Sequence, residues 1–368
     1  MGEIKILIIG AGPIGCYTAK LLKAALKDFD IAIIEEHSEI GRPIHCAGLV
    51  STGVFTKLKV PIDDDAVINH IDGAEVFLNH NSFKINRKDV AVVIDRERFD
   101  RALGKGLNIY FNTRFVGIEK EGKGYLIETD KGEYYADIVI GADGANSLLR
   151  KIVGLKEDIA YLRGVQFRMR YAQCNKNFVQ VYLKNPFFTW VIPEGENIIR
   201  VGIISSNPYH DLMEFLKERS IEGEILEKFA GVAPLGKCSI QNGGLVLVGD
   251  AACQLKPLTH GGVYYGMRCA EILVDCILQN RLGEYEKECR NRFGREIDIG
   301  LKFRQMYARL SQDETEKFFA ILKDNAVAMG ELGEFESHSK VISLLIRDSR
   351  LQILLGKVFI GILRDAFI

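Results

Sequence analysis

The sequence predicts an α/β fold in which a Rossmann-like nucleotide-binding domain carries an inserted antiparallel β-sheet and is followed by a helical C-terminal region. Three observations lead to this prediction. An apolar segment near the N-terminus runs into a glycine-rich turn and a helical pattern. Two later stretches, 71–93 and 161–204, alternate apolar and polar residues as half-buried strands do. The pattern after Thr259 is mainly helical.

The N-terminal segment, residues 4–36, is predicted to form a β-α-β unit. Residues 4–9 are nearly all apolar, as a parallel strand buried on both faces requires. A helix at about 14–27 and a second strand at 29–35 follow. The turn before the helix allows backbone N–H groups to approach a pyrophosphate at the helix N-terminus. Its residues are Gly10, Gly12, Pro13, Ile14 and Gly15.

An acidic residue at the end of the second strand supports this interpretation. Glu35 follows Gly15 by 20 residues, the separation expected of a carboxylate that accepts hydrogen bonds from an adenosine ribose. Its neighbour Glu36 is the alternative for that role. This first motif predicts a dinucleotide without saying which one.

A second motif near residue 250 identifies the dinucleotide. The apolar strand that ends in Val248-Gly249-Asp250-Ala251-Ala252 is followed by Pro257, Gly261 and Gly262. An Asp at a strand end can bind the ribityl chain, which a flavin has and a nicotinamide nucleotide lacks. The two motifs together predict FAD, and therefore a redox protein.

The segments between the motifs predict how the chain is divided into domains. Asp95 is expected to cap a helix, strands are expected at 109–129, 137–141 and 161–204, and a helix is expected at about 209–229. We therefore expect a discontinuous FAD-binding domain over 1–70, 94–160 and 240–300, a substrate sheet domain over 71–93 and 161–239, and a C-terminal helical region over 301–368.

One glycine-rich segment is a false motif. Gly231 to Lys237 fits the first seven positions of a phosphate-binding P-loop, but Cys238 stands where Ser or Thr should hold magnesium. Pro234 also removes one of the N–H groups of the cradle. We expect a helix before this segment and a turn within it.

The amino-acid composition restricts the classes of function that the chain can have. The 368 residues have a formal net charge of −1 and no basic tract interleaved with aromatic residues, which gives no support to a nucleic-acid partner. The eight cysteines form no C-x-x-C pair and no zinc spacing, so we expect free thiols, no metal site and a cytoplasmic location. The segment from Val341 to Ile368 is apolar but interrupted by charges, and it fits either a packing or dimer-forming face or a helix lying on a membrane surface.

The three glycine and acid motifs together resemble the FAD-dependent para-hydroxybenzoate-hydroxylase-like superfamily over roughly residues 1–300. The third of these motifs is Gly141 to Gly144, which contains Asp143. The resemblance implies a glutathione-reductase type of FAD-binding domain. It also implies that Arg96 reaches the cofactor and that the loop from Pro257 to Gly262 lies by the flavin pyrimidine edge.

Two further motifs are similar to those of the geranylgeranyl reductase family. The segment from Gly41 to Ser51 resembles that family's cysteine-bearing segment and includes Cys46, Ala47 and Gly48. Phe188-Thr189-Trp190-Val191-Ile192-Pro193, with Gly202, resembles a signature that shapes a lipid cavity. Ile192 and Ile204 depart from that signature, and His260 stands where a glycine often follows the proline of the flavin loop.

The narrower resemblance implies a reductase that saturates the C=C bonds of prenyl lipids such as archaeal ether lipids. Hydride would come from reduced flavin, and Cys46, His45, water or the flavin itself would supply the proton. Reducing equivalents would come from NAD(P)H or a ferredoxin-like protein, because no second nucleotide fingerprint is present. Two rivals remain: a flavin monooxygenase or halogenase, since Phe188 to Pro193 also resembles a halogenase motif, and a flavoprotein that carries electrons to a quinone.

Overall fold

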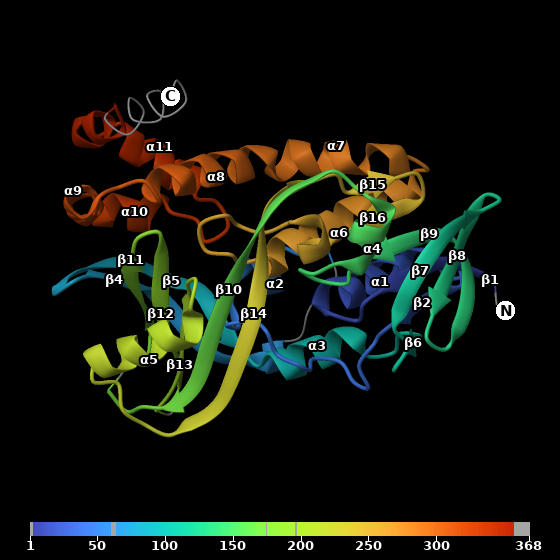
Figure 1. The fold of residues 1–368 in the computed structure, drawn as a ribbon, viewed down its shortest axis with the longest axis horizontal. Helices are drawn as coiled ribbons and strands as arrows, with labels where there is room; N and C mark the ends of the chain where they lie inside the picture. Colours follow the sequence, from blue (N-terminus) through green and yellow to red (C-terminus); the bar gives the residue numbers. More distant parts are fainter. Residues whose placement is uncertain (1–2, 60–63, 174, 196, 357–368) are drawn as a thin grey trace.

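The computed structural model describes residues 3–59, 64–173, 175–195 and 197–356. Two eight-stranded sheets and a set of C-terminal helices make up the described chain (Figure 1). The predicted α/β fold, with an inserted sheet and a helical C-terminal region, is confirmed.

The nucleotide-binding sheet has the order β15-β16-β9-β1-β2-β6, with β7 and β8 extending it through β9. β1 lies parallel to both β2 and β9, and its residues Ile6, Leu7 and Ile8 are buried on both faces, which explains its continuous apolar sequence. The strands are β1 (Glu3–Ile9), β2 (Ile31–Ile34), β6 (Ile109–Tyr110), β7 (Phe115–Glu121), β8 (Gly124–Thr129), β9 (Gly132–Gly141), β15 (Gln241–Asn242) and β16 (Leu245–Leu247).

The second sheet, which includes the predicted substrate strands and is called the substrate sheet after that prediction, has the order β14-β10-β13-β12-β11-β4-β5-β3. Its pairs are antiparallel except that β11 lies parallel to β4. The strands are β3 (Leu49–Ser51), β4 (Val67–Leu78), β5 (Asn81–Ile94), β10 (Glu157–Arg170), β11 (Phe178–Lys184), β12 (Phe187–Gly195), β13 (Ile198–Ile204) and β14 (Ile225–Cys238).

The helices connect and cover the two sheets. Asp95 caps α3 by accepting a hydrogen bond from the Arg98 N–H, as the sequence predicts. The helices are α1 (Pro13–Ala25), α2 (Gly53–Thr56), α3 (Arg96–Gly104), α4 (Leu148–Val153), α5 (Pro208–Glu218), α6 (Val263–Leu278), α7 (Tyr285–Cys289), α8 (Arg295–Tyr307), α9 (Gln312–Asp324), α10 (Ala326–Leu332) and α11 (Ser339–Ile346).

The helix predicted at 209–229 is wrong in its second half. α5 ends at Glu218, and β14 begins at Ile225 and pairs with β10 along almost its whole length. The turn expected from Gly231 to Lys237, and the helix expected before it, are therefore wrong as well, because this segment lies inside β14. Pairing with a strand some 60 residues away in the chain overrides the local pattern, and Figure 1 shows the long β10–β14 ribbon that results.

The C-terminal helices pack against the substrate sheet. A hydrophobic cluster joins Val76 and Phe83 of that sheet to Phe318, Phe319 and Leu322 of α9, and the Phe83 and Phe319 rings are 5.2 Å apart. Among the described residues of the predicted amphipathic segment, Ile342, Leu345, Leu351 and Leu354 are buried. Their packing agrees with the packing-face interpretation, while residues 357–368 lie outside the described chain. In the part that is described, no helix combines the length and the apolar character needed to cross a bilayer.

Candidate functional site

A cavity of about 1540 Å³ extends from the glycine-rich turn of the nucleotide-binding sheet to the C-terminal helices. Its wall includes residues of the three glycine and acid motifs, one face of the substrate sheet, and α8, α9 and α11. Segments as far apart in the chain as Ile9 and Leu345 therefore meet around one space.

The glycine-rich turn is closely packed on one side and open on the other. Gly10 has φ +101°, and a Cβ there would lie 2.6 Å from the Ala142 carbonyl oxygen. A Cβ on Gly15 would lie 2.0 Å from the Gly10 carbonyl oxygen. Gly12 is the N-cap of α1, provides no side-chain cap, and has open space where a Cβ would stand. The first-turn N–H groups of α1 are therefore available to an anion, as a pyrophosphate site requires.

The Glu35 carboxylate is hydrogen-bonded to the backbone of this turn. Its Oε2 accepts a hydrogen bond from the Ala11 N–H at 2.7 Å, and its Oε1 lies 2.6 Å from His37 Nδ1. Both Glu35 and Glu36 line the cavity, so the predicted ribose contact is compatible with the position of either carboxylate. His37 was not singled out from the sequence, because nothing in its spacing marks it.

Two aspartates stand at the ends of neighbouring strands. Asp143, after β9, accepts a hydrogen bond from the Leu149 N–H at 3.1 Å through Oδ2, while its Oδ1 is buried without a partner. Asp250, after β16, lines the cavity, and desolvation by the surrounding protein raises the pKa of its carboxyl, although Arg96 acts in the opposite direction. A Cβ on Gly262 would lie 2.5 Å from Asp250 Oδ1. Asp143 Oδ1 therefore lacks a donor of the kind that a hydroxyl group of a bound nucleotide would supply.

Arg96 lies beside Asp100 and the Cys46 thiol. Its Nη2 is 2.9 Å from Asp100 Oδ2. Burial alone would lower the pKa of Arg96, but Asp100 and Cys46 outweigh that effect and raise it. The guanidinium group is thus held charged at the cavity wall, as the resemblance implies for a residue that reaches the cofactor.

Cys46 and His45 are placed differently. Cys46 is half-buried, and its Sγ accepts a hydrogen bond from the Gly48 N–H at 3.4 Å. His45 is exposed, and its Nδ1 lies 2.6 Å from the Ala230 carbonyl oxygen of β14. Because a carbonyl only accepts, the Nδ1 atom carries the proton, and the ring is tied to the backbone of the sheet.

The aromatic motif lines the cavity from β12. Trp190 donates a hydrogen bond from Nε1 to Gln166 Oε1 at 2.9 Å and stands opposite Gly202 of β13. A Cβ on Gly202 would lie 2.4 Å from the Trp190 ring. Phe188 stacks on His260, with ring centroids 5.8 Å apart and an interplanar angle of 4°. His260 has φ +58°, the left-handed conformation for which a glycine is the usual choice.

Most of the predicted cofactor and substrate residues line the cavity. Four predicted cofactor residues do not line it and instead shape the backbone or pack behind it: Gly15, Gly48, Gly249 and Pro257. Of the predicted substrate residues, Phe188 and Trp190 line it, whereas Pro193 and Gly202 do not. The lining residues are Gly10, Gly12, Pro13, Ile14, Glu35, Glu36, His45, Cys46, Ala47, Arg96, Asp143, Gly144, Asp250, Gly261 and Gly262.

The cavity wall also contains polar residues that the sequence analysis missed. Lys256 is 2 % exposed, its Nζ lies 3.1 Å from Glu336 Oε2, and burial lowers its pKa. Nearby, burial lowers the pKa of His338 to about 3. The position of Lys256 next to Pro257 in the flavin loop is a signal that could have been used. His338 has no comparable signal.

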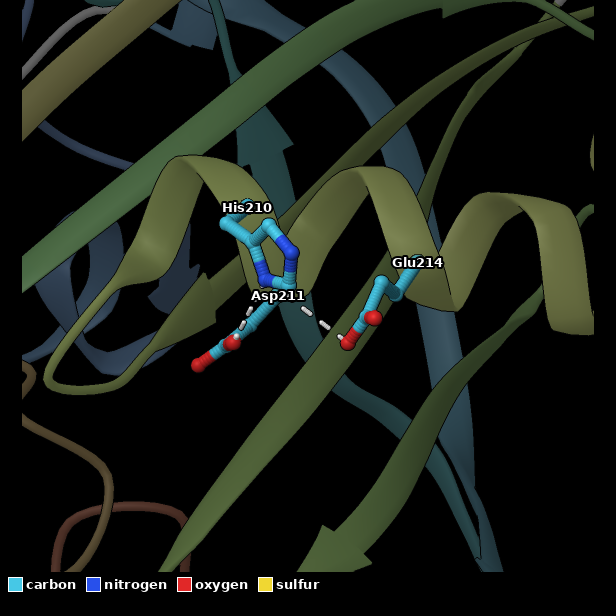
Figure 2. Close-up of side chains that lie close together, drawn as sticks. All are labelled: His210, Asp211 and Glu214. Carbon is cyan, nitrogen blue, oxygen red and sulfur yellow. Dashed lines mark hydrogen bonds and ion pairs between the residues drawn. The ribbon is translucent and has the colours of Figure 1, made fainter.

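A separate cluster lies on the surface of α5. Figure 2 shows His210 beside Asp211 and Glu214, with Nδ1 3.5 Å and 3.7 Å from the two carboxylates. His210 is 60 % exposed. We interpret it as a solvated group of charges.

Known proteins provide an independent comparison. A family model of an NAD(P)-binding Rossmann-like domain matches residues 8–60. An uncharacterized protein of Methanocaldococcus jannaschii is 34 % identical over 86 % of this chain and 87 % of its own. Digeranylgeranylglycerophospholipid reductase 1 of Methanothermobacter thermautotrophicus is 29 % identical over 97 % of this chain and 98 % of its own.

Two solved structures share the fold. A geranylgeranyl bacteriochlorophyll reductase-like protein from Thermoplasma acidophilum has a TM-score of 0.81 and 24 % identity, and the match covers 94 % of this chain and 100 % of that one. The p-nitrophenol 4-monooxygenase of Pseudomonas putida has a TM-score of 0.70 and 15 % identity, and the match covers 95 % and 99 % of the two chains.

Proposed function

Because the chain belongs to the geranylgeranyl reductase family of flavin-dependent oxidoreductases, we propose that it binds FAD and saturates C=C bonds of a geranylgeranyl-type prenyl lipid. The observation that carries the proposal is the continuity of the cavity. The same space is lined by the glycine and acid motifs at one side and by apolar side chains of the substrate sheet and the C-terminal helices at the other.

The residues fit FAD. The open first turn of α1 would hold the pyrophosphate, Glu35 or Glu36 the ribose, and Asp250 the ribityl chain. Asp143, Gly144, Arg96, Gly261 and Gly262 would contact the remaining parts of the cofactor. When bound and reduced, FAD supplies the hydride. The division into an FAD-binding domain, a substrate sheet and a C-terminal helical region is part of this proposal.

The apolar wall would bind the prenyl chain and exclude water. Residues from both covering layers line it, among them Val76, Ile85, Val179, Val181, Leu183, Phe318, Leu322 and Leu345. Phe188 and Trp190 would orient the double bond over the cofactor, since rigid aromatic rings restrict where an apolar chain can lie.

Saturation also needs a proton at the carbon next to the one that receives the hydride. Cys46 is the candidate donor, because its Sγ lines the cavity and is half-buried. His45 is less well placed, because its Nδ1 proton is committed to the Ala230 carbonyl. The electron donor is proposed to be external, either NAD(P)H or a ferredoxin-like protein.

The reaction can be tested directly. FAD-loaded protein is reduced with dithionite without oxygen, and a geranylgeranyl phospholipid is added. We expect the flavin absorbance to return as the lipid gains two hydrogens per bond, measured by mass spectrometry. Reoxidation only by oxygen, with an oxygenated product, would instead support a monooxygenase. Reoxidation by quinone without a lipid product would support an electron carrier.

A further inference from the structure

Arg304 of α8 is a cation without a counter-ion at the cavity wall. Its Nη1 lies 3.2 Å from His260 Nε2, and no carboxylate of the described chain pairs with it. Its surroundings lower its pKa through desolvation. Burying a guanidinium group without a counter-ion costs free energy, because the charge loses part of its hydration. A bound anion would offset this cost.

The contact with Arg304 determines the protonation of His260. Arginine only donates, so His260 Nε2 must accept, and the ring proton lies on Nδ1. Burial and Arg304 lower the pKa of His260 to about 3, so the ring is neutral and does not add a second charge. His260 Nδ1 is buried without a partner. The nearby basic residue Lys256 is already paired with Glu336.

A second unsatisfied polar group, the hydroxyl of Tyr307, lies one turn along α8 from Arg304. Tyr307 Oη is buried and has no hydrogen-bond partner, and burial raises its pKa to about 12. Residues three apart on a helix share a face, so Tyr307 and Arg304 belong to the same side of α8. Arg304, His260 and Tyr307 all line the cavity. All three side chains therefore offer hydrogen-bond donors, and two of these donors, His260 Nδ1 and Tyr307 Oη, have no acceptor.

Arg304, His260 and Tyr307 lie next to the apolar part of the cavity wall. Thr259, the neighbour of His260, is exposed and lines the cavity, so the cavity reaches the surface beside Arg304. On the inner side, Phe188 stacks on His260, and Phe303 and Phe318 line the wall. A cation beside an opening and an apolar wall behind it suit an amphiphile that has an anionic end.

We propose that Arg304, supported by His260 and Tyr307, binds phosphate oxygens of the substrate's headgroup while the prenyl chain extends into the apolar space. This inference rests on the proposed function for the identity of the chain. The chemistry that it assigns is recognition of a phosphate, and the source is the lipid headgroup. Because the headgroup would be held in place, only the double bonds within a limited distance of it along the prenyl chain could reach the cofactor.

The test compares two ligands with the same prenyl chain, geranylgeranyl diphosphate and geranylgeraniol. Binding to oxidised, FAD-loaded protein is measured by calorimetry, which needs no turnover. We expect Arg304→Gln to weaken binding of the diphosphate by roughly 10- to 100-fold, as for loss of hydrogen bonds to a charged group, and to leave the alcohol unchanged. Arg304→Lys should retain part of the preference. Arg295→Gln, on the exposed surface of the same helix, should match the unmodified protein.

The other outcomes would overturn the inference. Equal weakening of both ligands by Arg304→Gln would indicate a structural role. Inorganic pyrophosphate that binds as tightly as the prenyl diphosphate would indicate a site for free phosphate. A changed flavin spectrum in Arg304→Gln with unchanged ligand preference would assign the residue to the cofactor. If the phosphate preference holds while no lipid is reduced, the subsite stands and the proposed function fails.

Discussion

Several residues of this site affect the cavity through the neighbouring residues that they contact. Trp190 can lie flat across β13 only because residue 202 has no side chain, since a Cβ there would come within 2.4 Å of the indole. Gly202 therefore does not touch the cavity but determines the shape of its aromatic wall. The sequence motif contains both residues, yet their relation depends on strand register, which no local pattern specifies.

Replacing Gly202 with valine tests this relation. We expect a loss of about 1–3 kcal/mol in the free energy of unfolding, because the new side chain overpacks the sheet against the indole. Trp190 is the single tryptophan of the chain, so its fluorescence should shift as the ring is displaced. Gly283→Ala, at a glycine whose Cβ would meet nothing within 4 Å, should leave both properties unchanged. An unshifted emission spectrum in the valine variant would argue against the contact.

Cys46→Ala tests the proposed proton donor. We expect the rate of prenyl reduction to fall by roughly 100-fold or more, as on removal of a general acid, while FAD remains bound. Single-turnover flavin oxidation and the flavin absorbance measure the two properties. Cys276→Ala, at a buried cysteine outside the cavity wall, is the matched control. Turnover that survives the Cys46 change would move the role to water or to another group.

At the scale of elements, prediction from sequence succeeded where the signal is local. The β-α-β unit, the cap of α3 and the strand before Asp250 are each encoded within a few residues. β14 was missed because its identity comes from pairing with β10. The contribution of α8 was missed for the same kind of reason, since Arg304 and His260 are neighbours only in the folded chain.

An ionic link within the substrate sheet also depends on pairing. Glu194 accepts hydrogen bonds from Arg168 of β10 and Arg200 of β13, at 2.8 Å and 3.2 Å. Burial alone would raise the pKa of Glu194, but the two arginines outweigh that effect and lower it. A carboxyl whose pKa is lowered on folding stabilises the fold above its unfolded pKa, and the contribution is lost as the pH falls through the folded pKa.

We therefore expect Glu194→Gln to reduce the free energy of unfolding by roughly 1–3 kcal/mol at neutral pH. The difference from the unmodified protein should shrink as the pH falls below about 4.3, the unfolded value for a glutamate. Urea unfolding across this range measures it, and Glu222→Gln, at an exposed position, is the control. A difference that does not change with pH would contradict the ionic explanation.

At the scale of the whole molecule, the cavity joins the two sheets and the C-terminal helices, so cofactor binding should stabilise all of them together. FAD at 100 times its dissociation constant is expected to raise the free energy of unfolding by about 2.7 kcal/mol. Asp250→Asn should lose much of this gain. Its cofactor-free form should be no less stable than the unmodified protein at neutral pH, because burial raises the Asp250 pKa and so disfavours its charged form.

Denaturant titrations with and without FAD measure both effects. Asp211→Asn, on the surface of α5, serves as the control because that residue lies outside the cavity wall. An undiminished FAD-dependent gain in Asp250→Asn would remove this carboxylate from the cofactor site.

The sequence predicted more of the residues that line the glycine-motif side of the cavity than of those that line its apolar side. Glycines and acids that bind a nucleotide sit in short motifs because turn geometry requires them there. Apolar residues that line a chamber look like ordinary core residues until the fold shows which of them face an empty space, as Val76 and Leu345 do.

The C-terminal wall has an evolutionary consequence. Residues 295–356 line one side of the cavity and contain none of the glycine motifs that we propose to bind the nucleotide. If the proposed function is correct, we expect mutations in α8 to α11 to change which lipids are accepted and to leave the glycine and acid motifs in place. We expect relatives that act on different lipids to differ in the residues that line this wall.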